Sequence, residues 1–282
     1  MGCLNSNEGF SHWFGNIHLS GPCNRSCYFC IGQHMMALDP LNNLSRFPLD
    51  NLDKFVEQCH SRGVTEVNVT GTNTDPLMYE YQAELKAYLS KHIPGLTLGL
   101  RTNGALITRR WDLWELYDKA SITICSLHPE TYRRMMGQGS PPDIATILAA
   151  TKKPVKINVV LGPENVHNYD ILDTIDRLGD MGVRVINMRE PYGQPHVGNP
   201  LESLTPAGFV HGMPYYERAG ALVTYWDVHY VEVESVNLYA NGVVSETYPI
   251  TKGHCPTTGK VLSQDNFQNS GRVREQWLNI LG

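Results

Sequence analysis

The chain has 282 residues, of which 41% are hydrophobic and 18% charged, and its formal net charge is −5. This composition fits a globular protein with a full-sized core. Lys and Arg form no basic stripe of the kind that binds nucleic acid, and no apolar run reaches the roughly 18 residues that a membrane-spanning helix needs. The N-terminus has no basic segment followed by an apolar one, so we expect a cytoplasmic protein without a secretory signal.

Short β-branched runs alternate with helical patterns along the first two thirds of the chain. In chain order, the sequence predicts strands over 16–20, 65–71, 96–104, 121–127, 155–162 and 183–190, and helices over 48–63, 79–92, 110–120, 143–153 and 168–182. Such alternation is typical of a parallel sheet with covering helices. We therefore predict an α/β fold, a partial TIM-like (βα)6 barrel of parallel strands.

The pattern changes at about residue 195. A Gly/Pro-rich stretch comes first, residues 221–250 then alternate around Asn241-Gly242, a good hairpin turn, and a short helix is expected over 273–281. We expect an N-terminal segment over 1–13, the barrel over 14–195, and a small β-containing extension over 196–282 that packs on the barrel and faces the substrate.

Three of the seven cysteines, Cys23, Cys27 and Cys30, directly follow the first predicted strand with the spacing C-x3-C-x2-C. A structural zinc site needs four ligands, for which His34 or Cys255 could supply the fourth. An iron–sulfur cluster held by three thiolates would instead leave one iron open for catalysis. The remaining cysteines are scattered, which indicates a reducing compartment rather than a disulfide framework.

Polar residues follow the other predicted strands at their carboxyl ends, where a βα barrel places its chemistry. They are Thr70, Gly71, Thr72, Asn73 and Asp75 after the second strand, Arg101 and Asn103 at the third, Ser126 and His128 after the fourth, Asn158 within the fifth, and Arg189 and Glu190 after the sixth. Strand alternation would point Ser126 into the barrel and Cys125 toward the helices.

The run "CNRSCYFC" resembles the cluster motif of the radical S-adenosylmethionine (radical SAM) superfamily, including Phe29 before the last cysteine. The resemblance extends over roughly residues 14 to 195. The segments "LRTNG" (100–104), "SL" (126–127) and "KINVVLGPEN" (156–165) are most similar to the branch that contains the molybdenum-cofactor GTP cyclase. The C-terminal third departs from that branch, because it has Cys255 alone where auxiliary-cluster cysteines would be needed.

The resemblance implies that the three cysteines hold a [4Fe-4S] cluster, to which S-adenosylmethionine (SAM) binds at the open iron. Reductive cleavage of SAM would give a 5'-deoxyadenosyl radical that takes hydrogen from a small polar metabolite or nucleotide, leading to C–C bond formation or rearrangement. It also implies an electron donor such as flavodoxin or ferredoxin. The alternatives are a radical SAM maturase of a peptide substrate and a non-catalytic metal-binding module.

The resemblance also assigns cofactor-binding residues. The run "TGTNTDP" (70–76) stands where family members carry a Gly-Gly-Glu-like run that binds the SAM amino group, with a helix cap as the alternative role of Asp75. We expect Phe29, Asn103, Ser126, Asn158 and Arg189 at SAM as well, and assign Arg101 and Tyr192 to the substrate. The alternative for Arg189 is an ion pair with an acid such as Glu190.

Overall fold

The computed structural model describes residues 13–35, 41–192, 194–210, 213–227 and 234–246. Eleven strands form one sheet in the order β11-β10-β1-β2-β3-β4-β5-β6-β9-β8-β7. Neighbouring strands from β10 through β9 pair in parallel, and β7, β8 and β11 are antiparallel to their neighbours. The strands are Phe14–Leu19 (β1), Glu66–Gly71 (β2), Thr97–Thr102 (β3), Lys119–Ile124 (β4), Val155–Val160 (β5), Val185–Arg189 (β6), Gly208–Val210 (β7), Met213–Arg218 (β8), Ala221–Trp226 (β9), Ser235–Leu238 (β10) and Val244–Ser245 (β11).

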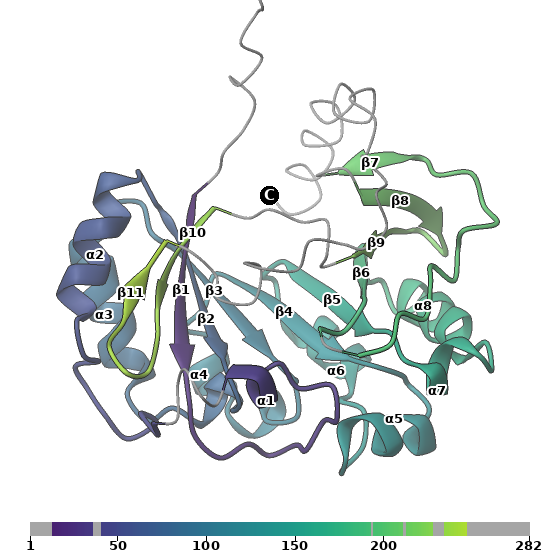
Figure 1. The fold of residues 1–282 in the computed structure, drawn as a ribbon, viewed down its shortest axis with the longest axis horizontal. Helices are drawn as coiled ribbons and strands as arrows, with labels where there is room; N and C mark the ends of the chain where they lie inside the picture. Colours follow the sequence, from purple (N-terminus) through teal and green to yellow (C-terminus); the bar gives the residue numbers. More distant parts are fainter. Residues whose placement is uncertain (1–12, 36–40, 193, 211–212, 228–233, 247–282) are drawn as a thin grey trace, which may run out of the picture.

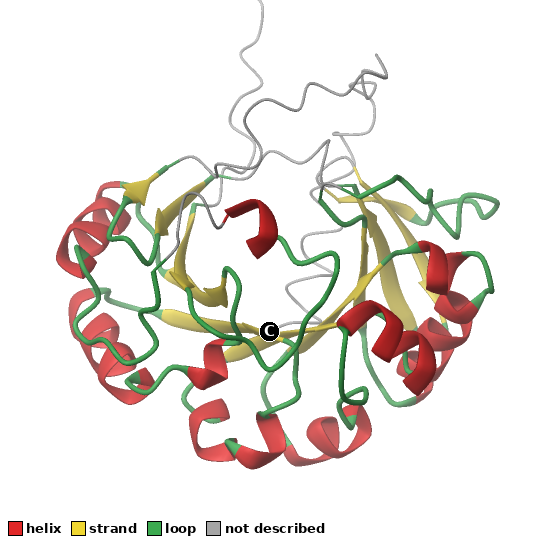
Figure 2. Ribbon diagram, turned by 60° about the horizontal axis from the view of Figure 1, so that its bottom comes forward, coloured by secondary structure: helices red, strands yellow, loops and turns green. Residues whose placement is uncertain are grey.

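The helices cover the outer face of this sheet, which curves around an interior that faces away from them (Figure 2). The α-helices are Gly32–Met35 (α1), Leu52–Ser61 (α2), Gln82–His92 (α3), Trp111–Trp114 (α4), Pro129–Met136 (α5), Ile144–Ala150 (α6), Pro163–Val166 (α7) and Asp170–Asp180 (α8), with 3-10 turns at Pro76–Met78 (η1) and Ile107–Arg109 (η2). The six-step βα order and the partial barrel predicted from the sequence are confirmed (Figure 1). No described helix is both long and apolar enough to cross a membrane.

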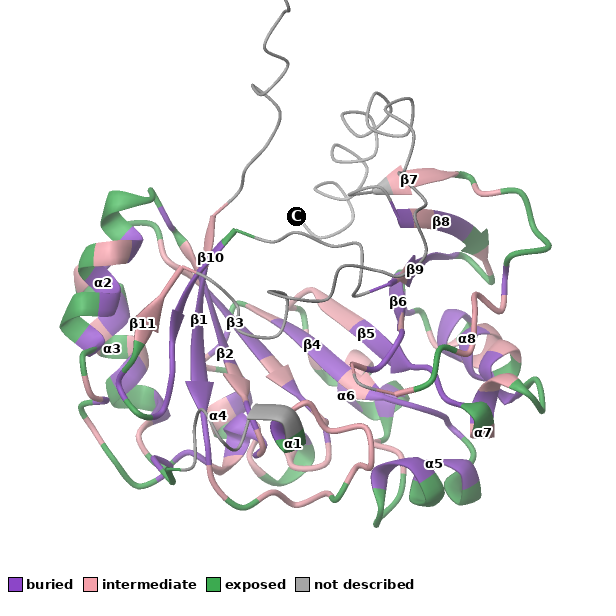
Figure 3. Cartoon of the chain, in the orientation of Figure 1, coloured by how far each residue is buried: buried purple, intermediate pink, exposed green. Residues whose placement is uncertain are grey.

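Strand alternation separates an apolar outer layer from a polar interior. In β5, Ile157 and Val159 belong to the buried core, whereas the Asn158 side chain lies on the other face and bonds to Ser121 of β4. The same alternation recurs from strand to strand, because residues two apart share a face. Most strand residues are buried (Figure 3), and burial against the helices holds the sheet together while the inner face carries polar groups.

The strands beyond residue 208 join the barrel sheet itself. β9 pairs in parallel with β6 at one edge, and β10 pairs in parallel with β1 at the other. The expected hairpin at Asn241-Gly242 is confirmed, because β10 and β11 are antiparallel around it and Gly242 has a φ of 78°. The expected β-containing extension is confirmed, and its strands continue the barrel sheet at both edges. The boundaries 1–13, 14–195 and 196–282 stay a prediction.

One predicted helix is largely wrong. The range 110–120 contains only the four-residue α4, and Lys119 already begins β4. Asp118 explains the early strand, because its backbone N–H donates to Leu98 O and its side chain accepts from Leu98 N, both at the edge of β3. The sequence prediction also missed α5. The expected helix over 273–281 and Cys255 lie outside the described residues.

Candidate cofactor site at the carboxyl ends of the strands

The three cysteines lie on the loop that joins β1 to the short helix α1 (Figure 1). All three are half-buried and free of disulfides. The Cys27 Sγ lies 3.4 Å from Met136 Sδ at the end of α5, the Cys30 Sγ lies 3.8 Å from the Thr72 carbonyl oxygen after β2, and the Cys23 Sγ lies 3.6 Å from Asn24 Oδ1. The loop is thus held between the end of α5 and the segment after β2.

The thiols lie close enough to affect one another electrostatically. Burial and, to a smaller extent, the neighbouring Cys30 and Cys23 thiols raise the pKa of Cys27 to about 12. Burial also raises the pKa of Cys23 and of Cys30. The thiols are therefore protonated at neutral pH, and binding a metal group would release their protons.

The donor set fits an iron–sulfur cluster better than a single metal ion. Each thiolate ligand of a cluster binds its own iron, so three thiols on one loop can bind three of the irons. A zinc ion instead needs its ligands to converge on one point, and no three His, Cys, Asp or Glu side chains of the described residues do so. The His34 side chain lies outside the described part of the structure.

Helix α5 fixes the path of the cysteine loop. The backbone N–H groups of Ser26 and Tyr28 donate to the carbonyl oxygens of Met136 and Met135, at 3.1 and 3.4 Å. Gly137 ends the helix with a φ of 81°, and a Cβ there would lie 2.0 Å from Ser26 Oγ. Free carbonyl groups at a helix end thus bind the loop, and glycine permits the close approach.

The loop after β2 reaches the cysteines through its backbone and one amide. The Asn73 Oδ1 accepts bonds of 2.9 Å from Ser20 Oγ and from Gly21 N, which fixes the start of the cysteine loop. Gly71 allows the tight turn, because a Cβ there would lie 1.8 Å from Thr74 O. The Thr72 Oγ1 is buried without a hydrogen-bond partner, on the residue whose carbonyl faces Cys30. An unsatisfied buried hydroxyl is the kind of group that a bound ligand satisfies.

Asp75 takes the alternative role of a cap. Its Oδ1 accepts from Leu77 N at 3.0 Å, and its Oδ2 accepts 2.7 Å bonds from Thr102 Oγ1 and Asn103 N. Burial raises the pKa of this carboxyl group. Asn103 in turn donates from Nδ2 to Asn24 Oδ1 at 2.7 Å, so the end of β3 is connected to the cysteine loop.

Ser126 bonds to an outer helix. Its Oγ donates to Asp170 Oδ1 at 2.6 Å, at the start of the outer helix α8, and accepts from His128 N at 2.8 Å. Cys125 is fully buried within the hydrophobic core, and burial raises the pKa of its thiol. The expected place of Ser126 at SAM stays a prediction.

The inner face of β5 carries a cation that the sequence analysis missed. Lys156 lies two residues before Asn158, so both side chains share the interior face. Burial and, to a smaller extent, the neighbouring Arg101, Arg189 and Lys119 lower the pKa of Lys156 to about 7. The strand pattern contained this signal, because Lys156 alternates with the core residues of β5. The structure thus brings Arg101 and Arg189 near the half-buried Lys156.

Asn158, Asn187 and Thr224 stand opposite one another on β5, β6 and β9. The Asn158 Nδ2 donates to Ser121 Oγ at 2.5 Å, and its Oδ1 accepts from Asn187 Nδ2 at 3.5 Å. The Asn187 Oδ1 and the Thr224 Oγ1 are buried and have no hydrogen-bond partner. The barrel interior thus contains unsatisfied polar atoms near the middle of these strands.

The remaining predicted residues lie around the mouth. Tyr192 packs beside Tyr239, and Phe29 packs edge-on against Tyr28, with ring centroids 5.5 Å apart. Glu190 pairs with His196, whose Nδ1 is 3.3 Å away, and the expected roles of Arg189 stay a prediction. Thr70 lies on β2 opposite His18.

A hollow of about 260 Å³ adjoins the cysteine loop. Tyr28 lines it from the loop, and its hydroxyl donates to Glu164 Oε2 at 2.8 Å. The other walls come from the ends of β5 and β6, and the lining residues are Gly162, Pro163, Glu164, Pro191, Gln194 and Pro195. Rings of tyrosine and proline beside a carboxylate suit a flat group that carries hydrogen-bond donors.

Comparison with known proteins agrees with this arrangement. The sequence profile described as the radical SAM superfamily matches residues 17–189. A GTP 3',8-cyclase of Rhodococcus opacus (strain B4) is 26% identical over 171 residues, which are 58% of this chain and 48% of that protein. A second GTP 3',8-cyclase, from Brucella ovis, is 27% identical over 154 residues, 51% of this chain and 43% of its own length. The chain thus spans about half the length of these curated relatives.

A solved structure shares the fold over most of the chain. The crystal structure of SuiB from Streptococcus suis superposes with a TM-score of 0.56 at 13% sequence identity. The match covers 93% of this chain and 65% of SuiB. At this identity the match shows the fold alone, and it extends the agreement beyond the barrel into the strands after residue 208.

Proposed function

The chain belongs to the radical SAM superfamily and is a radical SAM enzyme, and we propose that it takes a hydrogen atom from a small polar metabolite or nucleotide that carries an anionic group. The abstraction would lead to C–C bond formation or rearrangement. The family implies a [4Fe-4S] cluster and SAM, which supply the 5'-deoxyadenosyl radical when bound.

The cysteine loop is the observation that carries the cofactor part of the proposal. Cys23, Cys27 and Cys30 would hold the cluster, because they are the thiols that α5 and the loop after β2 keep together at the barrel mouth. Thr72 offers an unsatisfied buried hydroxyl beside Cys30 for the amino acid end of SAM. The Tyr28-lined hollow would take the flat base of SAM, and Glu164 would accept hydrogen bonds from it.

The polar interior supports a small anionic substrate. Lys156, whose pKa is about 7, lies near Arg101 and Arg189 on the inner face, where the carboxylate of Glu66 is paired with Lys119 at 2.6 Å. A carboxylate or phosphate group of the substrate would be attracted to these cationic side chains, and Asn187 and Thr224 would accept hydrogen bonds from the body of the molecule.

Position along the barrel gives the substrate an orientation. Lys156 is the second residue of β5, whereas the cysteine loop meets the carboxyl ends of the strands. Four residues of strand separate Lys156 from the end of β5, about 13 Å. The anionic end would therefore bind deep in the barrel, and the carbon that loses hydrogen would face the mouth.

A screen of SAM cleavage tests the substrate class. The anaerobic, reconstituted protein would be incubated with SAM and separate pools of anionic small metabolites, neutral small metabolites and peptides. We expect the anionic pool to stimulate release of 5'-deoxyadenosine, with deuterium from a labelled substrate appearing in it. Stimulation by peptides alone would replace this proposal with a peptide maturase.

The proposal also requires a source of electrons. Each cleavage of SAM consumes one electron, and a protein such as a flavodoxin or a ferredoxin would deliver it. Dithionite can replace that protein in the assay, so a need for a protein donor is separable from the chemistry of the site.

A further inference from the structure

We propose that Glu190 is a positioning residue for SAM, because its buried carboxylate holds the segment after β6 that forms one wall of the Tyr28-lined hollow. This inference rests on the proposed function, in which that hollow takes the flat base of SAM. Glu190 itself does not line the hollow, so its effect on SAM is exerted through the segment that it binds.

The wall in question is formed by Pro191, Gln194 and Pro195. These residues belong to a segment whose described residues form neither a helix nor a strand. The opposite wall follows β5 and includes the first residues of α7, so regular backbone hydrogen bonds support it. No regular secondary structure supports the described residues of the Pro191–Pro195 wall, and its position therefore depends on side-chain contacts.

Packing holds this segment only in part. Val197 is partly buried against the core, and Leu201 is buried four residues later. Between them, Gly198, Asn199 and Pro200 border a second hollow of about 280 Å³, which residues at the start of α8 also line. Atoms that border a void have no contacts on that side, so hydrogen bonds have a large share in fixing the segment.

Glu190 supplies these hydrogen bonds. Its Oε1 accepts from Gly198 N at 3.0 Å and lies 3.3 Å from His196 Nδ1, and its Oε2 accepts from Val197 N at 3.5 Å. Three consecutive residues, which directly follow Pro195 of the wall, are thus bound to one carboxylate.

Glu190 is in turn fixed to the sheet. The residue is 3% exposed, its backbone N–H donates to Trp226 O at 3.2 Å, and the Tyr225 hydroxyl donates to its Oε1 at 3.0 Å. Both partners lie on β9, the strand that pairs with β6 (Figure 1). A buried carboxylate is costly unless donors satisfy it, and here the donors come from the sheet on one side and from the segment on the other. The carboxylate therefore fixes the segment relative to the sheet.

Loss of this carboxylate would release the segment. The N–H groups of Val197 and Gly198 would lose their acceptor, and the second hollow offers space into which the segment can move. The Pro191–Pro195 wall would then no longer be held in place beside Tyr28. The cysteine loop depends on other contacts, with α5 and with Asn73, so the site for the amino acid end of SAM should stay intact.

Two substitutions of Glu190 and two controls test this role. Glu190→Ala removes the acceptor, whereas Glu190→Gln keeps one acceptor oxygen and should retain part of the effect. Ile147→Ala creates a cavity at a fully buried residue of α6 and controls for a general loss of stability. Glu217→Gln removes a negative charge at an exposed position of β8.

Three measurements separate the base of SAM from its amino acid end. The dissociation constant of 5'-deoxyadenosine, which carries the base, would be measured by equilibrium dialysis with the anaerobic, reconstituted protein. Methionine, which carries the amino acid end, would be followed through its effect on the electron paramagnetic resonance spectrum of the reduced cluster. Hydrogen exchange at the amides of Val197 and Gly198 would be measured in the protein without cofactors.

We expect Glu190→Ala to bind 5'-deoxyadenosine at least about tenfold more weakly than the wild type, and Glu190→Gln to fall between them. Methionine should change the cluster spectrum at the same concentration in all variants. The KM for SAM should rise together with this dissociation constant, while the maximal rate of SAM cleavage stays at the wild-type value. Exchange at Val197 and Gly198 should be faster in Glu190→Ala than in either control.

The two controls make the result specific to Glu190. Binding of 5'-deoxyadenosine by Glu190→Ala as tight as that by the wild type would overturn the proposal, and so would an equal loss of binding in Ile147→Ala. A wild type that neither binds 5'-deoxyadenosine nor cleaves SAM would contradict the proposed function itself, and with it the role of Glu190.

Discussion

The carboxylate of Asp75 joins the loop after β2 to the end of β3, because its Oδ2 accepts a 2.7 Å bond from Thr102 Oγ1. The same oxygen accepts from Asn103 N, and Asn103 donates to Asn24 within the cysteine loop. A residue that is buried for structural reasons is thus connected, through Asn103, to the loop that carries the cysteines. Its carboxylate also contributes to the raised pKa of Cys23.

We predict that Asp75→Ala lowers the free energy of unfolding by about 2–4 kcal/mol, because three donors lose a buried charged acceptor. Urea denaturation would measure the loss. Asp180→Ala, at an exposed position at the end of α8, should change stability by less than about 0.5 kcal/mol. Asp75→Asn keeps one acceptor oxygen and should fall between the two. A cost for Asp75→Ala no larger than that of the control would contradict this account of the cap.

The cluster assignment predicts an effect on iron that is specific to three of the cysteines. Cys27→Ala should abolish the iron–sulfur absorbance of the reconstituted protein, because the loop supplies three thiolates and the cluster needs all of them. Cys59→Ala is the matched control, since Cys59 is a buried thiol of α2 within the hydrophobic core. The control should bind iron as the wild type does, and equal iron in both variants would place the cluster elsewhere.

His18 should make stability fall with acid. Burial lowers its pKa from 6.5 to about 4, so the ring is neutral in the fold and protonates in the unfolded chain at higher pH. Its contribution is complete above pH 6.5 and is lost as the pH falls toward about 4, by up to about 3 kcal/mol. His18→Gln should reduce this slope in urea titrations, whereas His167→Gln, at an exposed position, should not. Equal slopes for His18→Gln and the wild type would contradict a buried neutral ring.

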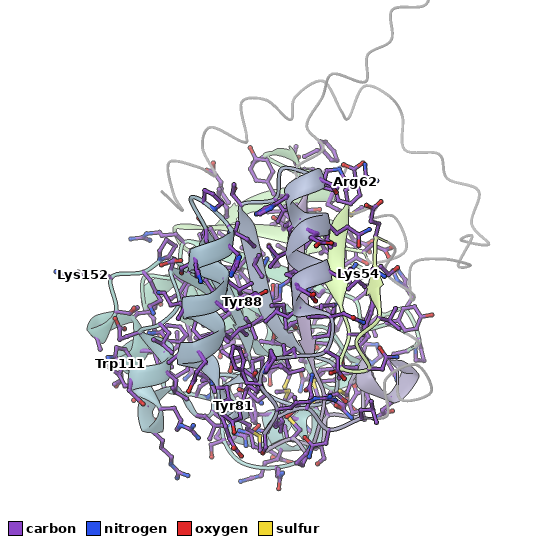
Figure 4. All side chains as sticks on the ribbon, turned by 90° about the vertical axis from the view of Figure 1, so that its left-hand side faces the viewer. Lys54, Arg62, Tyr81, Tyr88, Trp111 and Lys152 are labelled. Atoms are coloured by element: carbon purple, nitrogen blue, oxygen red, sulfur yellow. The ribbon has the colours of Figure 1, made fainter. Side chains whose placement is uncertain are left out.

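Lys156→Met should stabilise the protein while removing its response to an anionic substrate. Replacing a desolvated cation among other cations by an apolar side chain should raise the free energy of unfolding by about 1–3 kcal/mol at pH 6. The pKa of Lys156 is about 7 in the fold, so the gain should shrink as the pH rises above 7, where the folded lysine is already neutral. Lys152→Met is the control, because Lys152 projects into solvent (Figure 4). A destabilised Lys156→Met variant would contradict the crowding of cations around this site.

The sequence was sufficient for the strands and for the cysteine loop, because both depend on local patterns. β-branched runs such as 155–162 correspond to β5, and the C-x3-C-x2-C spacing placed Cys23, Cys27 and Cys30 at the mouth. The wrong helix at 110–120 has a non-local cause, since the bonds between Asp118 and Leu98 draw the chain into the sheet.

Side-chain direction at strand ends was harder to predict. Ser126 follows β4 by two residues and turns to Asp170, a partner 44 positions away that no local pattern reveals. The parallel pairing of β9 and β10 with the barrel edges likewise depends on contacts between distant segments. Lys156 could have been found, because it shares the inner face of β5 with Asn158.

The most direct test of the central claim is the cleavage of SAM by the anaerobic, reconstituted protein with dithionite, read as 5'-deoxyadenosine by mass spectrometry. The account predicts that the wild type releases 5'-deoxyadenosine and that replacement of Cys23, Cys27 or Cys30 by alanine abolishes its release. Release that persists without these thiols, or a protein that binds zinc and no iron, would contradict the account.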